Sequence, residues 1–241
     1  ALELGKLTNA TGGFLGEGAN TVGGHVAWAL PSGANARQMF EQARKAYVLM
    51  GLEPEFDCAN PQLVVGALKQ ASLVVYMSAF KNVPALEYAD VMLPVAPYTE
   101  TSGTFINIEG RVQSFNGVVK ARGDCRPAWK VLRVLGNVLN LDGFEYESSE
   151  AVRDEIVGKG AEFVSGLDNG LSAIEIKLEA STVTGLQRIA DVPINFADPM
   201  ARRSPALQQT ADSVAPVARI SAETLGQLGI AHGAQVRIKQ G

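Results

Sequence analysis

The residue types that most often carry chemistry are scarce in this 241-residue chain, whose cysteines are Cys58 and Cys125 and whose histidines are His25 and His232. An iron–sulfur cluster ordinarily takes four thiolates, and a structural zinc ion usually takes four Cys or His ligands. These four residues lie far apart in the sequence and have no partners at metal-ligand spacing. We therefore expect no metal centre within this chain, and reduced thiols instead of a disulfide framework.

Cys58 is the better of the two candidates for a reactive thiol. It lies just after a predicted strand, at the end of a parallel sheet where such folds bind ligands. A buried, inert sulfur is nevertheless the preferred interpretation. Glu100, Glu109 and Arg111 flank a predicted turn, and a salt bridge there is favoured over an acid–base pair because no nucleophile or metal accompanies them.

The glycine-rich stretch Gly16-Glu17-Gly18-Ala19-Asn20-Thr21 begins like a dinucleotide-binding fingerprint. It lacks the third glycine, and no apolar strand precedes it, so backbone N–H groups and a helix dipole are not expected to meet a pyrophosphate. The P-loop pattern G-x-x-x-x-G-K-[ST] does not occur either. The stretch is predicted to be a loop, which argues against an ordinary NAD-binding domain and against a P-loop hydrolase.

Helices alternate with short apolar strands after this loop. Helices are expected over 35–46, after the N-cap and N1 pair Asn60-Pro61, and over 84–89, and buried strands over 47–50, 73–77 and 90–93. The order predicts an α/β fold, with a Rossmann-like parallel sheet that has helices on both faces. Residues 99–115 alternate in the strand manner around Glu109-Gly110, which predicts a β-hairpin with positive φ at Gly110.

A helix is predicted from Pro127, packed on the sheet by its apolar face, which comprises Trp129, Leu132, Leu135, Val138 and Leu139. Four segments follow from this pattern: a glycine-rich loop with one short helix over 1–33, the α/β domain over 34–145, a linker with a helix near 149–157 over 146–200, and the beginning of a β-barrel-like domain over 201–241. In the last segment, short strands are expected between Val217 and Gln240, on both sides of a helix at 223–228.

The net charge is −4 with a sequence pI near 5.3, and the Lys and Arg residues are scattered. The basic stripe of a nucleic-acid-binding protein is therefore missing. No apolar run approaches the roughly 18 residues of a membrane-spanning helix, so membrane insertion is not expected.

The stretch ADVMLPVAPYTETSGTFINIEGRVQSF, residues 89–115, resembles the signature of the molybdopterin oxidoreductases. Its core GTFINIEGR is most similar to the large iron–sulfur (G) subunit of bacterial NADH:quinone oxidoreductase, complex I. The segments AYVLMGLEP, WKVLRVLGNVLNLDGFEY and ADPMARRSPALQ add to the resemblance. It implies that the chain is a carboxy-terminal piece of that subunit.

In catalytic members of the family the fold holds a pterin dinucleotide, and the resemblance implies a vestigial pocket here with Gly51, Glu53, Cys58, Ser102 and Gly103 as candidate residues. The loop from Gly51 to Glu55 carries two carboxylates, which would be unfavourable beside a phosphate. We therefore expect no cofactor in this fragment. Iron–sulfur clusters are expected in an amino-terminal part of the subunit that lies outside this sequence.

The resemblance implies a scaffold in the peripheral arm of complex I that supports NADH-to-quinone electron transfer without a redox centre of its own, and that is inactive alone. The expected partners are other peripheral-arm subunits and the subunit's own amino-terminal Fe–S domains, at the cytoplasmic face of the inner membrane. The alternative is a fragment of a catalytic molybdopterin-dependent oxidoreductase such as a formate dehydrogenase, in which residues near Gly51, Cys58 and Ser102-Gly103 would touch the cofactor.

Overall fold

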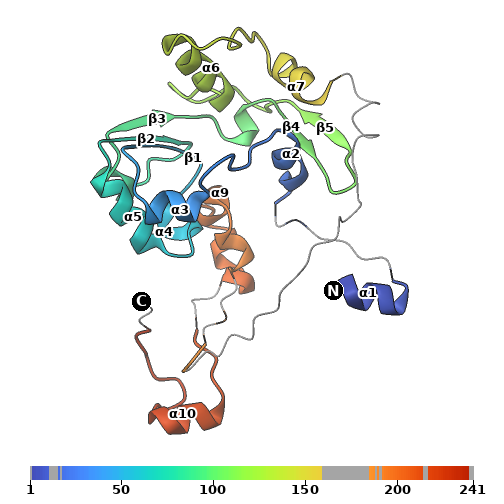
Figure 1. Cartoon of the computed structure of the whole chain (residues 1–241). Coiled ribbons are helices and arrows are strands. Elements are labelled where there is room, and N and C mark those ends of the chain that lie inside the picture. Colours follow the sequence, from blue (N-terminus) through green and yellow to red (C-terminus); the bar gives the residue numbers. More distant parts are fainter. Residues whose placement is uncertain are drawn as a thin grey trace. The chain divides into compact units, whose positions relative to one another are not determined.

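The computed structural model describes residues 2–10, 16, 18–158, 185–187, 189, 192–213 and 217–238. The chain divides into two compact units, residues 1–187 and 188–241. The helices and strands of the first unit are α1 (Leu2–Thr8), α2 (Thr21–Val26), α3 (Ala36–Glu41), β1 (Ala46–Met50), α4 (Pro54–Asp57), α5 (Pro61–Gln70), β2 (Leu73–Ser78), β3 (Val91–Pro94), β4 (Gly103–Ile106), β5 (Val112–Phe115), α6 (Ala128–Val138) and α7 (Ser149–Val157) (Figure 1).

Strands β1, β2 and β3 form a parallel sheet in the order β1-β2-β3. Short 3-10 turns follow β2 and β3, at Pro84–Glu87 and Tyr98–Glu100. The predicted α/β fold with a parallel sheet is confirmed, and β1 and β2 begin and end within one residue of the predicted strands. The predicted helix over 84–89 is a single 3-10 turn, and α3 ends five residues earlier than expected.

One face of the sheet carries the core. The side chains that pack there alternate along the strands and meet α5 and the turn after β2; they are Tyr47, Leu49, Val64, Leu68, Val74, Tyr76, Ala85 and Tyr88. Helix α3 is joined to this core by Tyr47, whose hydroxyl donates to the Met39 carbonyl at 2.8 Å and whose ring stacks on Phe40. Burial of these apolar side chains is the main stabilising contribution to the unit.

Helix α5 begins as predicted. The Asn60 Oδ1 atom accepts a hydrogen bond from the Leu63 N–H at 3.1 Å, and Pro61 occupies the first turn, where its missing N–H costs nothing.

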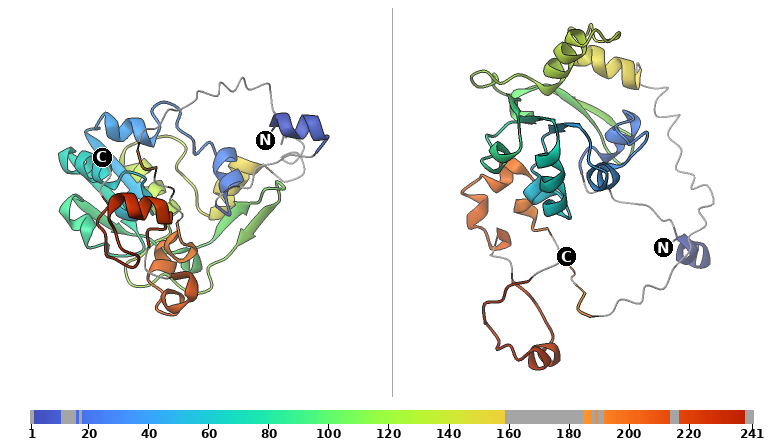
Figure 2. Two further views of the ribbon diagram at one scale, coloured as in Figure 1. Left: turned by 90° about the horizontal axis from the view of Figure 1, so that it is seen from below. Right: turned by 60° about the vertical axis from the view of Figure 1, so that its left-hand side comes forward.

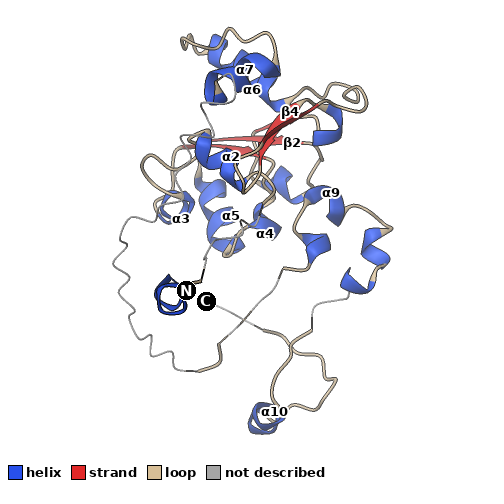
Figure 3. Ribbon diagram, turned by 90° about the vertical axis from the view of Figure 1, so that its right-hand side faces the viewer, coloured by secondary structure: helices blue, strands red, loops and turns tan. Residues whose placement is uncertain are grey.

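The other face of the sheet is open along β1 and at the start of β2, although Met77 on the same face is fully buried. Val48 and Met50 are each 54% exposed, and Leu73 and Val91 beside them are also exposed. Figures 1 and 3 show α3, α4 and α5 on one side of the sheet and α6 on the opposite side. The prediction that α6 packs on the sheet through its apolar face is not confirmed, because Leu135, Val138 and Leu139 on that face are exposed. The described helices therefore cover one face only.

The hairpin follows the prediction. Strands β4 and β5 pair in antiparallel register from Gly103–Phe115 to Ile106–Val112. Gly110 has a φ of 78°, as expected for the turn. The Asn107 Oδ1 atom accepts hydrogen bonds from the N–H groups of Glu109 and Arg111 at 3.0 and 2.9 Å, and so holds the turn from within.

The amino-terminal segment contains two short helices, α1 and α2, where one was expected. Asn20, which precedes α2, accepts a hydrogen bond from the Ile106 N–H at 2.8 Å, so α2 is attached to the edge of β4. Glu100, Glu109 and Arg111 do not form the predicted ion pair, since Glu100 accepts from the Arg122 N–H and Glu109 from the Asn107 amide.

The second unit is built from short turns, namely α9 (Pro199–Arg202), α10 (Ala222–Leu228) and the 3-10 turns Ile194–Phe196, Leu207–Gln209 and Ala211–Ser213. Its centre is Asn195, whose Nδ2 group donates to the Leu207 carbonyl, the Thr210 hydroxyl and the Ser213 hydroxyl at 3.2, 3.0 and 2.8 Å. The views in Figure 2 show the successive short turns of this segment.

The strands predicted between Val217 and Gln240 do not form within residues 217–238 that the structure describes, although the helix expected there is present as α10. The apolar side chains of that stretch, Val217, Ile220, Val236 and Ile238, are exposed. Isolated strands are not stable without a pairing partner. The barrel-like domain remains a prediction. Among the described helices none is both long and apolar enough to cross a membrane.

Candidate functional site

The carboxyl ends of β1 and β2 bring two loops together at one edge of the sheet, the place where open α/β sheets bind ligands. Gly51 closes β1 with a φ of 63° and continues the ladder, its N–H donating to the Met77 carbonyl at 2.9 Å. The chain then turns into α4, while the loop after β2 leads to Asn82 and Tyr88. Of the predicted pocket residues, Gly51, Glu53 and Cys58 lie on this edge.

Three carboxylates follow β1: Glu53 precedes α4 as its N-cap residue, and Glu55 and Asp57 lie in α4. Glu53 is only 1% exposed, and its backbone N–H donates to Asp57 Oδ2 at 2.7 Å. Glu55 joins the second loop, because its Oε1 accepts from the Tyr88 hydroxyl at 3.1 Å and its Oε2 accepts from the Asn82 amide at 3.4 Å. The edge is thus negatively charged and held by its own hydrogen bonds. We call Glu55, Asn82 and Tyr88 the edge triad.

The protonation of the neighbouring groups follows from this environment. Burial, together with the charge of Glu55, raises the pKa of the Tyr88 phenol far above its ordinary value, and burial raises the pKa of the Tyr76 phenol. Both phenols therefore remain protonated at neutral pH. Burial, and then the carboxylates Asp57 and Glu55, also raise the pKa of the Cys58 thiol. The raised pKa favours the thiol over the thiolate, which is the nucleophilic form.

A cavity of about 170 Å³ opens beside this edge. It is mostly apolar and is lined by Tyr76, Ser78, Ala79, Phe80, Lys81, Met92, Leu93 and Pro94. Ligand pockets for drug-sized molecules measure roughly 300–1,000 Å³, so this one suits only a small molecule. Among the described residues that line it, Lys81 is the one cation.

Ser102 and Gly103 lie elsewhere, at the start of the hairpin, and the structure does not bring them into the lining of that cavity. Ser102 borders a second, more open cavity of about 410 Å³ whose lining also includes Glu100, Glu147, Glu150 and Lys130. The Ser102 hydroxyl contacts the Ser149 hydroxyl at 2.7 Å. With three carboxylates and one ammonium group among these residues, this cavity is also negatively charged.

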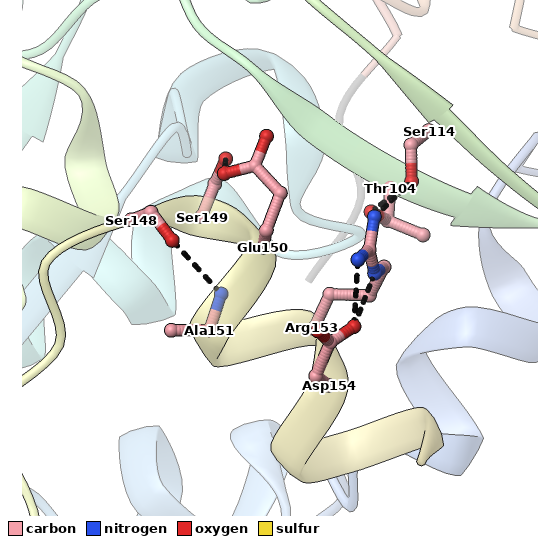
Figure 4. A network of polar contacts seen from close by, with 8 residues as sticks. All are labelled: Thr104, Ser114, Ser148, Ser149, Glu150, Ala151, Arg153 and Asp154. Atoms are coloured by element: carbon pink, nitrogen blue, oxygen red, sulfur yellow. Dashed lines mark hydrogen bonds and ion pairs between the residues drawn. The ribbon is translucent and has the colours of Figure 1, made fainter. Parts of the chain in front are cut away.

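Helix α7 is positioned against the hairpin by polar contacts (Figure 4). Ser148 caps the helix by accepting from the Ala151 N–H at 3.1 Å. Arg153 donates to the Ser114 hydroxyl at 3.2 Å and is paired with Asp154, while Ser114 contacts Thr104 across the hairpin at 3.0 Å. Every one of these polar groups is satisfied within the chain, so the network is structural.

Gly103 has a packing role. An added Cβ atom would stand 2.7 Å from Cζ of Phe115, the residue opposite it on β5. The absence of a side chain at Gly103 therefore leaves room for the Phe115 ring.

The described residues contain no cluster of three or more His, Cys, Asp and Glu side chains that could hold a metal ion. Sequence reasoning did not identify Asn82 and Tyr88, which complete the edge. The sequence could have indicated them, because both residues follow β2, and the carboxyl ends of neighbouring parallel strands lie at the same edge of the sheet.

Comparison with known proteins identifies the family. Residues 4–138, more than half of the chain, match the family model described as "Molybdopterin oxidoreductase". The chain belongs to the molybdopterin oxidoreductase family.

Two curated relatives agree with this result. A candidate formate dehydrogenase of Staphylococcus haemolyticus is 33% identical over 100 residues, which cover 42% of this chain and 10% of the relative. A nitrate reductase of Shewanella frigidimarina is 26% identical over 117 residues, which cover 48% of this chain and 12% of the relative. Among solved structures, acetylene hydratase from Pelobacter acetylenicus is similar with a TM-score of 0.44 and 20% identity, over 56% of this chain and 19% of that chain. The matched region is about a tenth of the length of these curated relatives.

The family name implies a pterin cofactor, and the edge residues can be tested against it. A pterin dinucleotide phosphate at this edge would lie near the carboxylates of Glu55 and Asp57, which would repel it, whereas Glu53 is buried. The first turn of α5 offers few free N–H groups to a phosphate, because the Leu63 N–H is bonded to Asn60 and Pro61 has no N–H. The adjoining cavity is also small. The described residues at this edge do not fit a dinucleotide phosphate.

Proposed function

We propose that this chain is a scaffold region of a redox subunit in the molybdopterin oxidoreductase family, and that the electron-transfer centres lie in other parts of that subunit. The observation that carries the proposal is the edge triad together with Glu53 and Asp57. Where a catalytic relative would have to receive phosphates, this chain has three carboxylates, one of them bonded to two donors of its own.

Within this proposal, the large iron–sulfur (G) subunit of NADH:quinone oxidoreductase is the particular protein that the sequence Gly103-Thr104-Phe105-Ile106-Asn107-Ile108-Glu109-Gly110-Arg111 resembles. The role would be to support NADH-to-quinone electron transfer from the peripheral arm, on the cytoplasmic face of the inner membrane. The partners would be neighbouring subunits and the Fe–S domains of the same polypeptide.

The second candidate is a piece of a working molybdopterin-dependent oxidoreductase, such as a formate dehydrogenase. The names of the relatives support it more directly than they support a complex I subunit, because formate dehydrogenases and a nitrate reductase are among the similar proteins. In that case the phosphates would be held by residues outside this chain, and the carboxylate edge would face another part of the cofactor.

The decisive experiment uses the full-length parent protein, purified from its own host with a carboxy-terminal tag. Under the scaffold proposal it contains iron but no stoichiometric molybdenum or tungsten, and acid denaturation releases no guanine nucleotide. Subunits that oxidise NADH co-purify with it. Stoichiometric molybdenum with released nucleotide, and dye reduction driven by formate, would overturn the scaffold proposal and establish the second candidate.

A further inference from the structure

Strand β1 is an edge strand, and its outer side is unpaired within the part of the chain that the structure describes. The N–H of Gly51 donates to the Met77 carbonyl of β2 at 2.9 Å. Because successive residues of a strand direct their backbone groups to opposite sides, the groups of Ala46, Val48 and Met50 face away from β2. These three residues are exposed, and no backbone hydrogen bond joins their outer groups to another described residue. Such a row of unpaired groups can pair with a further strand.

The sequence of β1 is typical of an interior strand. Natural edge strands usually carry a charged side chain, a proline or a bulge, which prevents pairing with other segments. The strand sequence AYVLM has no charge and no proline, and its register with β2 continues without a bulge over all five residues. The edge at β3 differs, because that strand ends at Pro94 and Arg126 pairs beside its end. The sheet is therefore open to extension at β1.

Burial of the side chains decreases across the sheet towards the same strand. Met50 of β1 and Met77 of β2 are partners in the register and point to the same face, yet Met50 is 54% exposed and Met77 is fully buried. Val48 is exposed to the same extent, whereas its partner Val75 is half-buried. The cover of this face thus reaches β2 but not β1. Parallel sheets are normally covered on both faces, so the apolar side chains of β1 favour a partner.

We propose that an extended segment of the parent polypeptide, from outside this sequence, pairs with the outer side of β1 and makes it an interior strand. The described residues supply a sheet of three strands, whereas sheets of globular proteins most often have about four to six. The matched region is about a tenth of the length of the curated relatives, so most of such a polypeptide lies outside it. The added strand, with its connection, would also cover Val48 and Met50 with apolar side chains.

Hydrogen exchange in the full-length parent protein tests this pairing at single amides, read by mass spectrometry with electron-transfer fragmentation. The outer N–H groups of Val48 and Met50 are compared with that of Leu49, which faces β2 and is the internal control. We expect the outer amides to exchange within about tenfold of Leu49, because paired amides of one strand become exposed together. Outer amides that exchange about a hundredfold faster than Leu49, as at a free edge, would overturn the proposal.

The same measurement identifies the source of the added strand. Protection of the outer amides should be present in the parent polypeptide purified free of other subunits, and dilution should not change it. Protection that requires other subunits would assign the strand to a partner protein, and protection lost on dilution would assign it to a second copy of the chain. Either result would contradict the proposal. The metal content of the sample does not enter this measurement, so its outcome is independent of the proposed scaffold function.

Discussion

The hydroxyl of Tyr88 donates a hydrogen bond to Oε1 of Glu55 across 33 residues of sequence, at 3.1 Å. This bond joins the loop after β1 to the end of the turn after β2. Tyr88 is buried, and three carboxylates lie close together after β1. The bond therefore gives one of these carboxylates a hydrogen-bond donor and ties α4 to the segment that follows β2.

Removal of this hydroxyl should therefore weaken the fold. Tyr88→Phe is expected to lower the free energy of unfolding by about 1 kcal/mol or somewhat more, because a hydrogen bond to a charged group is lost. Urea denaturation measures the change. Tyr98→Phe is the matched control, since Tyr98 is 59% exposed and its hydroxyl can bond to water. Equal effects of the two substitutions would mean that the bond to Glu55 contributes nothing specific.

The turn of the hairpin gives a second prediction. Gly110 has a φ of 78°, and a β-branched residue there should cost about 1–3 kcal/mol in backbone strain. Gly110→Val should therefore lower the melting temperature clearly more than Gly110→Asn, because asparagine tolerates positive φ better than valine does. If both variants lose the same amount, the position requires a small side chain and not an unusual backbone angle.

Substitution of Gly103 should destabilise the hairpin for a different reason, which is a close contact with Phe115. Gly103→Ala places a Cβ atom 2.7 Å from the Phe115 ring, and overpacking of this kind typically costs about 1–3 kcal/mol. Phe115→Leu in the same chain should recover part of the loss. Gly66→Ala in α5 is the control, because nothing lies within 4 Å of its added Cβ and alanine favours a helix by about 1 kcal/mol over glycine. Thermal unfolding that shows no difference between Gly103→Ala and Gly66→Ala would disprove the close contact.

The Cys58 thiol should resist alkylation. Its pKa is raised by burial and by Asp57 and Glu55, so the pH profile of its reaction with iodoacetamide should have a midpoint above that of a free cysteine. The sign for stability follows from the same shift. The folded state favours the protonated thiol, so this contribution is complete below the ordinary thiol pKa and is lost as pH rises through the folded-state value. Cys58→Ser should reduce the fall in stability over that alkaline range. A reaction profile like that of free cysteine would contradict the prediction.

The local elements were accessible from sequence because each had a physical signal of short range. Asn60 and Pro61 mark the start of α5, apolar runs mark β1 and β2, and Gly110 marks the turn. The parallel sheet follows from the alternation of helix and strand.

The edge triad was harder to predict because it depends on contacts between distant segments. Glu55 could be recognised as an unfavourable neighbour for phosphate, but its bonds to Asn82 and Tyr88 arise only when the two loops meet. Ser102 and Gly103 were grouped with the edge on resemblance alone, and the structure places Ser102 beside a different cavity and Gly103 at the start of β4. The exposure of the apolar face of α6 could not be predicted either, since amphipathic spacing identifies an apolar face but does not show whether it is covered.

The second unit depends on one amide group, and this dependence exposes it to chemical ageing. The Asn195 Nδ2 group donates to one carbonyl oxygen and to two hydroxyl groups. Deamidation would replace that donor with a carboxylate oxygen, which would face the Leu207 carbonyl without a proton to share. A single hydrolytic event during storage would therefore turn the contact with the Leu207 carbonyl from attraction to repulsion, and the extent of deamidation at Asn195 would serve as a record of how often the unit opens to water.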